Sequence, residues 1–201
     1  MLMLRIAALV VACLIAAPAT AQVVINEFMP DPSVDWSPSD GNEEYSSVED
    51  EWVEILNIGA TPVDITGWRL RDAASDSSWR YAFAGVLPAG GYAVVYGNEA
   101  YEWEDANGYP RYGLSLNNGG DGVALVRHDG IVVDEVSYDG SDVDDDRSIG
   151  RIPDGVGWWA VLDGLNPADP PITGIGPSPG DVNVASPVES CRWGQIKALY
   201  R

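Results

Sequence analysis

Short apolar runs separated by turn residues are the feature that most restricts the fold of this 201-residue chain. In residues 67–72, Trp68 and Leu70 alternate with two arginines, a two-residue period typical of a strand with one buried face. The other predicted strands are residues 23–28, 52–56, 61–65, 79–83, 92–96, 123–128 and 131–138, with a short stretch at 148–152. The pattern predicts an all-β sandwich or barrel without a helix in its body.

The turns between these runs carry their own signals. Asp129-Gly130 separates two strand patterns, and this dipeptide suits a type I′ hairpin turn, which needs positive φ at both central residues. We therefore predict a hairpin over residues 123–138. Residues 30–50 and 98–113 are polar or aromatic stretches without strand periodicity, and we predict two long loops there.

The first 21 residues resemble a cleavable signal peptide. Arg5 precedes an apolar stretch at 6–17, and Ala19-Thr20-Ala21 supplies small residues before a cleavage point. The apolar stretch is shorter than the roughly 20 residues that span a bilayer, which argues against a membrane anchor. Lipid attachment at Cys13 is the remaining alternative. We expect a mature chain without a transmembrane span, secreted or held at the cell surface.

Composition excludes several functions. The chain has 31 acidic and 11 basic residues, a net charge of −20, so it repels phosphate backbones and we expect no direct nucleic-acid partner. His128 is the single histidine, which rules out histidine-based triads and histidine-rich zinc sites. No nucleophile has a usable partner. We therefore expect a protein that is not an enzyme, with a carboxylate-pair glycosidase as the distant alternative.

Several motifs follow one another in a familiar order: Val24-Ile25-Asn26-Glu27, Glu51 to Asn57, Thr61 to Asp72, Leu87 to Tyr92, Leu116 to Asp121 and Ser148 to Gly155. In this order and spacing, residues 22–160 resemble the lamin tail domain. The resemblance implies an immunoglobulin-like β-sandwich, here expected to carry a flexible C-terminal tail. The expected division is a signal peptide at 1–21, the domain at 22–165, a Pro/Gly-rich linker at 166–187 and a basic amphipathic tail at 188–201.

The resemblance implies no catalytic residues. Bacterial members of the family are commonly modules of extracellular or surface proteins that bind or tether. We accordingly predict a secreted or surface-associated adhesion module of this bacterial type, whose partner is a protein or a cell-envelope component. Fold alone does not name that partner.

Two acidic clusters are candidate metal sites. Calcium takes six to eight oxygen ligands, which dense carboxylates and turn carbonyls can supply. The candidate ligands are Glu49, Asp50, Asp139, Asp142, Asp144, Asp145 and Asp146. Solvated surface charge is the simpler interpretation of both clusters, and calcium binding is the alternative.

Aromatic residues in the predicted loops suggest a second kind of ligand. Exposed tryptophan and tyrosine can stack on sugar rings, which makes a carbohydrate-binding module the alternative function. The candidates are Trp36, Tyr101, Trp103 and Tyr109. The simpler interpretation is that they cover the ends of the sandwich.

The C-terminal tail is predicted to form a short helix with an apolar face. Trp193, Ile196 and Tyr200 share that face, and Lys197 and Arg201 add positive charge. The tail either docks on the sandwich or is a recognition tag that an export or attachment system reads. The Pro/Gly-rich linker before it favours accessibility.

Overall fold

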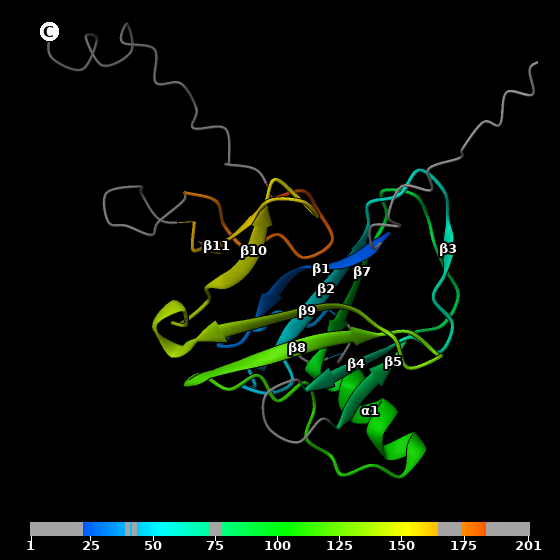
Figure 1. Cartoon of the computed structure of the whole chain (residues 1–201). Coiled ribbons are helices and arrows are strands. Elements are labelled where there is room, and N and C mark those ends of the chain that lie inside the picture. Colours follow the sequence, from blue (N-terminus) through cyan, green and yellow to red (C-terminus); the bar gives the residue numbers. More distant parts are fainter. Residues whose placement is uncertain (1–21, 39–40, 42–43, 73–77, 165–173, 184–201) are drawn as a thin grey trace, which may run out of the picture.

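The computed structural model describes residues 22–38, 41, 44–72, 78–164 and 174–183. Two larger antiparallel sheets face each other, and α1 lies beside β5 (Figure 1). The five-stranded sheet has the order β11-β10-β1-β2-β7, with strands Trp158–Leu162, Ser148–Ile152, Val23–Met29, Trp52–Asn57 and Tyr92–Tyr96. The four-stranded sheet has the order β5-β4-β8-β9, with strands Trp79–Ala82, Arg69–Asp72, Gly120–Val126 and Val132–Asp139. The small third sheet pairs β3 (Val63–Asp64) with β6 (Val86–Leu87).

The core lies between the two larger sheets. Ile25 and Ile55 project inward from the five-stranded sheet, and Leu70 and Leu125 project inward from the other. The alternation predicted for residues 67–72 is confirmed, because Leu70 is buried while Arg69 is exposed. The predicted all-β, immunoglobulin-like sandwich is confirmed with it.

The prediction of a loop over residues 98–113 is wrong in its first part, where α1 (Gly97–Asn107) forms. The Glu99 carboxylate accepts a hydrogen bond from the Tyr96 N–H at 3.0 Å, and Gly108 ends the helix with φ 73°. The buried side of α1 consists of Gly97, Asn98, Ala100 and Glu104. Because that side is small or polar, no apolar stripe marks the helix in the sequence.

The hairpin of β8 and β9 forms as predicted, but its turn is not type I′. Gly130 has φ 87°, whereas Asp129 is not among the described residues with positive φ. The Arg127 N–H donates to the Ile131 carbonyl, and the Gly130 N–H donates to the Arg127 carbonyl, both at 2.8 Å. The loop therefore has three residues and places only its glycine in the left-handed region. The Asp129 carboxylate pairs with the Arg127 guanidinium across this loop.

Residues 174–183, here called the strap, come from the predicted linker and lie against the five-stranded sheet. They are drawn in orange beside β10 and β11 in Figure 1. The Gly164 N–H donates to the Ile175 carbonyl at 2.9 Å, and Asn183 Nδ2 donates to the Arg151 carbonyl at 3.1 Å. The strap covers the face of the sheet that is turned away from the core, which we call the outer face.

Three predictions lie outside the described residues: the signal peptide, the tail at 188–201, and the tail residues Trp193, Ile196, Lys197, Tyr200 and Arg201. Within the described part of the chain, no helix has the length and apolar character needed to cross a membrane.

Candidate functional site

The first acidic loop is organised by Asp50, which is completely buried. Its Oδ1 accepts hydrogen bonds from the backbone N–H groups of Trp36 and Ser37, and its Oδ2 accepts one from Ser46, all at 2.8 Å. Its neighbour Glu49 is only partly buried. Both oxygens of Asp50 thus hold the loop in shape.

The second acidic loop is joined to the first by Asp146. Its carboxylate accepts hydrogen bonds from the Ser33 N–H at 2.9 Å, from the Ser33 hydroxyl and from Trp36 Nε1 at 2.8 Å. Burial raises the pKa of Asp146, but these hydrogen bonds outweigh burial and leave the pKa below its ordinary value. Asp146 therefore ties the two loops together as a carboxylate.

The remaining acidic candidates lie close to the surface. The Asp139 N–H donates to Asp142, and Asp144 pairs with Arg147 at 3.2 Å. A hollow of about 400 Å³ is lined by Asp144, Asp145, Asp146, Arg147 and Asp163. In the described part of the chain, no three acidic, histidine or cysteine side chains are grouped so as to hold a metal ion. Calcium binding stays a prediction.

The aromatic candidates occupy three different environments. Trp103 and Tyr109 stack on each other, with ring centroids 5.1 Å apart and planes at 16°. The Trp36 ring lies 6.4 Å from the ring of Trp52. The Arg111 guanidinium lies 4.6 Å above the ring of Tyr101. The four side chains therefore do not form one aromatic platform.

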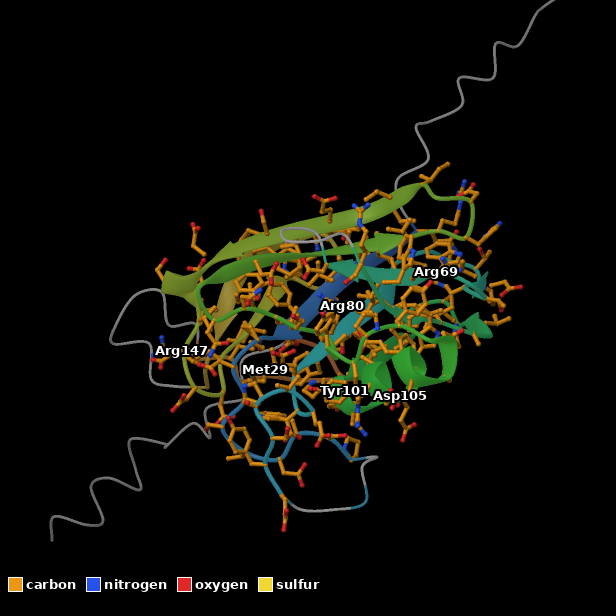
Figure 2. The ribbon with its side chains drawn as sticks, turned by 90° about the horizontal axis from the view of Figure 1, so that it is seen from below. Met29, Arg69, Arg80, Tyr101, Asp105 and Arg147 are labelled. Atoms are coloured by element: carbon orange, nitrogen blue, oxygen red, sulfur yellow. The ribbon has the colours of Figure 1, made fainter. Side chains whose placement is uncertain are left out.

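Tyr101 does line a surface hollow of about 300 Å³. The other lining residues are Val48, Glu51, Arg111, Tyr112, Ser115, Leu116 and Asn117. They come from α1, from the loop before β2 and from the loop between α1 and β8. Figure 2 shows Tyr101 on the α1 side of the molecule and Arg80 deeper in the interior.

A buried ionic network holds one wall of this hollow. Arg80 Nη2 lies 2.8 Å from Asp72 Oδ2, and Arg80 Nη1 lies 3.7 Å from Glu104 Oε1. The other Glu104 oxygen, Oε2, accepts hydrogen bonds from the N–H groups of Tyr112 at 2.7 Å and Gly113 at 2.8 Å. The Arg80 guanidinium also lies over the Tyr112 ring. The network fixes the loop that carries Arg111 and Tyr112.

Glu51 lines the hollow as a buried carboxyl group. Burial raises the pKa of Glu51 well above its ordinary value, although the backbone N–H groups of Leu116 and Ser115 oppose this by donating hydrogen bonds. A neutral carboxyl can donate as well as accept a hydrogen bond. The hollow thus combines tyrosine rings with hydrogen-bonding groups.

A second surface lies around the Trp158-Trp159 pair, two more aromatic residues near the loops that could anchor a protein interface. At the hairpin of β10 and β11, Val156 is 72% exposed and Trp158 is 70% exposed. The neighbouring Trp159 packs on Phe28, with ring centroids 5.7 Å apart, and lies under the Arg151 guanidinium. A two-residue period places consecutive tryptophans on opposite faces of a strand, so the Trp158-Trp159 pair could have indicated an exposed ring.

The turn that carries Val156 is fixed from several sides. The Gly155 N–H donates to Asn26 Oδ1 at 2.7 Å. Asp154 accepts hydrogen bonds from the Tyr92 hydroxyl at 2.7 Å and from the Asn183 N–H at 3.1 Å. Among the described strands, β11 pairs only with β10, so its other edge carries no strand. Val156, Trp158 and this free edge form one surface, here called the hairpin tip.

Comparison with curated proteins gives no match. Comparison with protein families matches residues 16–140 to the Lamin Tail Domain, which is more than half of the chain. The matched residues include β1 to β9 and end before β10 and β11, which nevertheless continue the same sheet beside β1. The chain therefore belongs to the lamin tail domain family.

Proposed function

We propose that this chain is an exported tethering module that binds a protein or a cell-envelope component through the hairpin tip. The observation that carries the proposal is the exposure of Trp158 and Val156 on a turn held by Asn26 and Asp154. Lamin tail domains are immunoglobulin-like binding domains of a non-catalytic type. The signal-like sequence of residues 1–21 supports export of the bacterial secreted type.

Physical reasons favour the hairpin tip as a contact surface. Tryptophan is enriched among the residues that dominate binding energy, since one ring buries a large apolar area. A turn that is already fixed loses little conformational entropy when a partner binds. The free edge of β11 can also pair with an extended segment of that partner.

Binding of the labelled, purified chain to intact cells of the producing organism tests this function. We expect Trp158→Ala to reduce binding by roughly tenfold or more, the range of an interface hot spot. Val156→Ala should weaken binding less. Val86→Ala is the matched control, because Val86 is 62% exposed but lies on β6. Unchanged binding by a folded Trp158→Ala variant would contradict the proposal.

A carbohydrate-binding function is the second candidate, and the hollow beside Tyr101 is the observation that favours it. Sugar sites combine aromatic faces with a few hydrogen-bonding groups, as Tyr101, Tyr112, Glu51 and Asn117 do here. Affinity electrophoresis in polysaccharide gels tests it. Tyr112→Ala should abolish retardation, whereas Tyr45→Ala, at a similarly exposed tyrosine, should not. Trp103→Ala should also leave retardation intact, because Trp103 stacks on Tyr109 outside the hollow lining.

Two further predictions have direct tests. Calcium binding by the second acidic loop would raise the melting temperature in millimolar calcium relative to EDTA, and an unchanged temperature would count against it.

The tail at 188–201 is tested by fusing it to a secreted reporter. Attachment of the reporter to the cell envelope would support a recognition tag, and an unchanged location would count against one.

A further inference from the structure

Two glutamates lie side by side on the outer face of the five-stranded sheet. Glu27 on β1 pairs in register with Glu54 on β2, and both are completely buried. A bulge at this point of β1 lets Asn26 also reach the outer face, where Asn26 Nδ2 donates to Glu54 Oε1 at 2.8 Å. Neither glutamate forms an ion pair with a described basic residue.

The strap covers both carboxyl groups and donates hydrogen bonds to them. The Ser178 N–H donates to Glu27 Oε1 at 3.1 Å, and the Ser178 hydroxyl lies 3.2 Å from Glu27 Oε2. The Gly180 N–H donates to Glu54 Oε2 at 2.6 Å. Below the strap, the Ser148 hydroxyl also donates to Glu27. Of the groups that cover the two carboxyls, Ser148 belongs to strand β10, whereas the strap belongs to no strand.

The other charged and titratable groups around the pair increase its negative potential. Asp154 from the β10–β11 turn acts on both glutamates, and Asp181 belongs to the strap itself. Tyr92 and Tyr96 of β7 are the titratable neighbours on the far side of β2. Arg151 on β10 instead bonds the Ile25 carbonyl and Asp134. The described residues thus give this pair acidic neighbours and no basic partner.

We propose that the strap is a proton-controlled latch, closed over Glu27 and Glu54 while they are neutral and released when both ionise. Two charges at paired positions repel each other in a dry environment, and water must enter to solvate them. Separating β1 from β2 would break a ladder of backbone hydrogen bonds. Releasing the strap breaks only a few contacts. The strap should therefore leave the sheet while β1 and β2 stay paired.

The direction of the switch follows from burial. Burial raises the pKa of Glu27 to about 7 and that of Glu54 to about 8, each from 4.5, and it outweighs the hydrogen bonds from Ser178 and Gly180, which lower these pKa values. The latch is accordingly closed in acid and opens as the pH rises past these values. Release breaks the strap hydrogen bonds between Gly164 and Ile175 and between Asn183 and Arg151. It also removes the Asn183 hydrogen bond to Asp154 at the hairpin tip.

Pulsed hydrogen–deuterium exchange on the full chain, corrected for intrinsic exchange rates, tests the latch. Between about pH 6 and pH 9, we expect peptides covering residues 174–183 to lose protection by roughly tenfold or more, while β8 stays protected. In the double variant Glu27→Gln and Glu54→Gln, strap protection should persist at high pH. A neutral amide still accepts the backbone hydrogen bonds but does not ionise.

Glu135→Gln is the matched control, since Glu135 lies on β9 with a half-exposed side chain and should leave the pH response unchanged. Constant strap protection across this pH range in the unaltered chain would overturn the proposal. Equal loss of protection in the double variant would overturn it as well. If the double variant does not fold, the pH series on the unaltered chain and on Glu54→Gln alone still decides the question.

Discussion

Trp36 Nε1 donates a hydrogen bond to Asp146 Oδ1 at 2.8 Å and so joins two loops whose contacting residues are 110 positions apart. The same carboxylate also accepts hydrogen bonds from Ser33. Both Trp36 and Asp146 were predicted from the sequence as ligand-binding residues. In the structure they bond to each other, and this contact holds one end of the sandwich together.

Asp146→Asn should therefore lower the free energy of unfolding by about 1–2 kcal/mol at neutral pH, because it weakens hydrogen bonds to a charged acceptor. Asparagine is the suitable replacement, since residue 146 has φ 55°, a conformation that asparagine tolerates. Urea unfolding provides the measurement. Asp145→Asn, at an exposed neighbour, should change stability by less than about 0.5 kcal/mol. Because the folded pKa of Asp146 is depressed, its contribution should disappear as the pH falls through that value.

The buried glutamates predict a second pH dependence of opposite sign. The pKa of Glu27 is about 7 and that of Glu54 about 8 in the folded chain, against 4.5 for both in the unfolded chain. Between pH 4.5 and these folded values, the folded state therefore binds more protons than the unfolded state. Stability is then complete below about pH 4.5 and falls as the pH rises through 7 to 8, by a few kcal/mol. Glu51 acts in the same direction. Urea unfolding at about pH 5 and pH 9 measures the difference, and Glu54→Gln should reduce it. Equal stability at both values would contradict the assignment.

Arg80→Met should destabilise the chain by about 3–5 kcal/mol, because it leaves Asp72 and Glu104 as buried carboxylates without their cation. Adding Asp72→Asn and Glu104→Gln should recover part of the loss. Arg111→Met removes an exposed arginine that pairs with Asp105 at 3.8 Å, and it should cost less than about 1 kcal/mol. Equal losses for the two arginines in chemical denaturation would show that the interior network has no special importance.

Gly97→Ala should disturb the start of α1. A Cβ atom at this position would lie 1.8 Å from the Val48 carbonyl oxygen, so the loop before β2 must move. The expected cost is about 1–3 kcal/mol, despite the better helix propensity of alanine. Gly119→Ala is the control, because no atom lies within 4 Å of a Cβ there. Circular dichroism during urea unfolding would detect the difference, and a neutral Gly97→Ala would show that the loop adapts freely.

The sandwich could be predicted because its strands carry a two-residue period with turn residues between them, as Trp68 and Leu70 illustrate. Helix α1 could not, since its buried face includes Glu104 and Asn98 rather than an apolar stripe. Its available signals were local: Glu99 near the start and Gly108 just after the end. The same two-residue period predicts that one ring of the Trp158-Trp159 pair is exposed.

The buried acids could not be recognised from the sequence. Glu54 lies between Val53 and Ile55, and Glu27 lies between Asn26 and Phe28; charged residues in such strand patterns are predicted to be exposed to solvent. Their cover comes from Ser178 and Gly180, more than a hundred positions later, in a Pro/Gly-rich stretch typical of a linker. Long-range contacts of this kind leave no local pattern in the sequence.

The position of β1 has a consequence for the timing of folding. This first strand lies in the middle of its sheet, between β2 and β10. A nascent chain can pair β1 with β2 early, but the other edge of β1 stays open until residues 148–152 have emerged. Such distant pairings are slow to form. We expect β10 to pair with β1 late in synthesis, after most of the polypeptide is available. A chain ending near residue 140 would therefore leave the second edge of β1 unpaired and prone to aggregation.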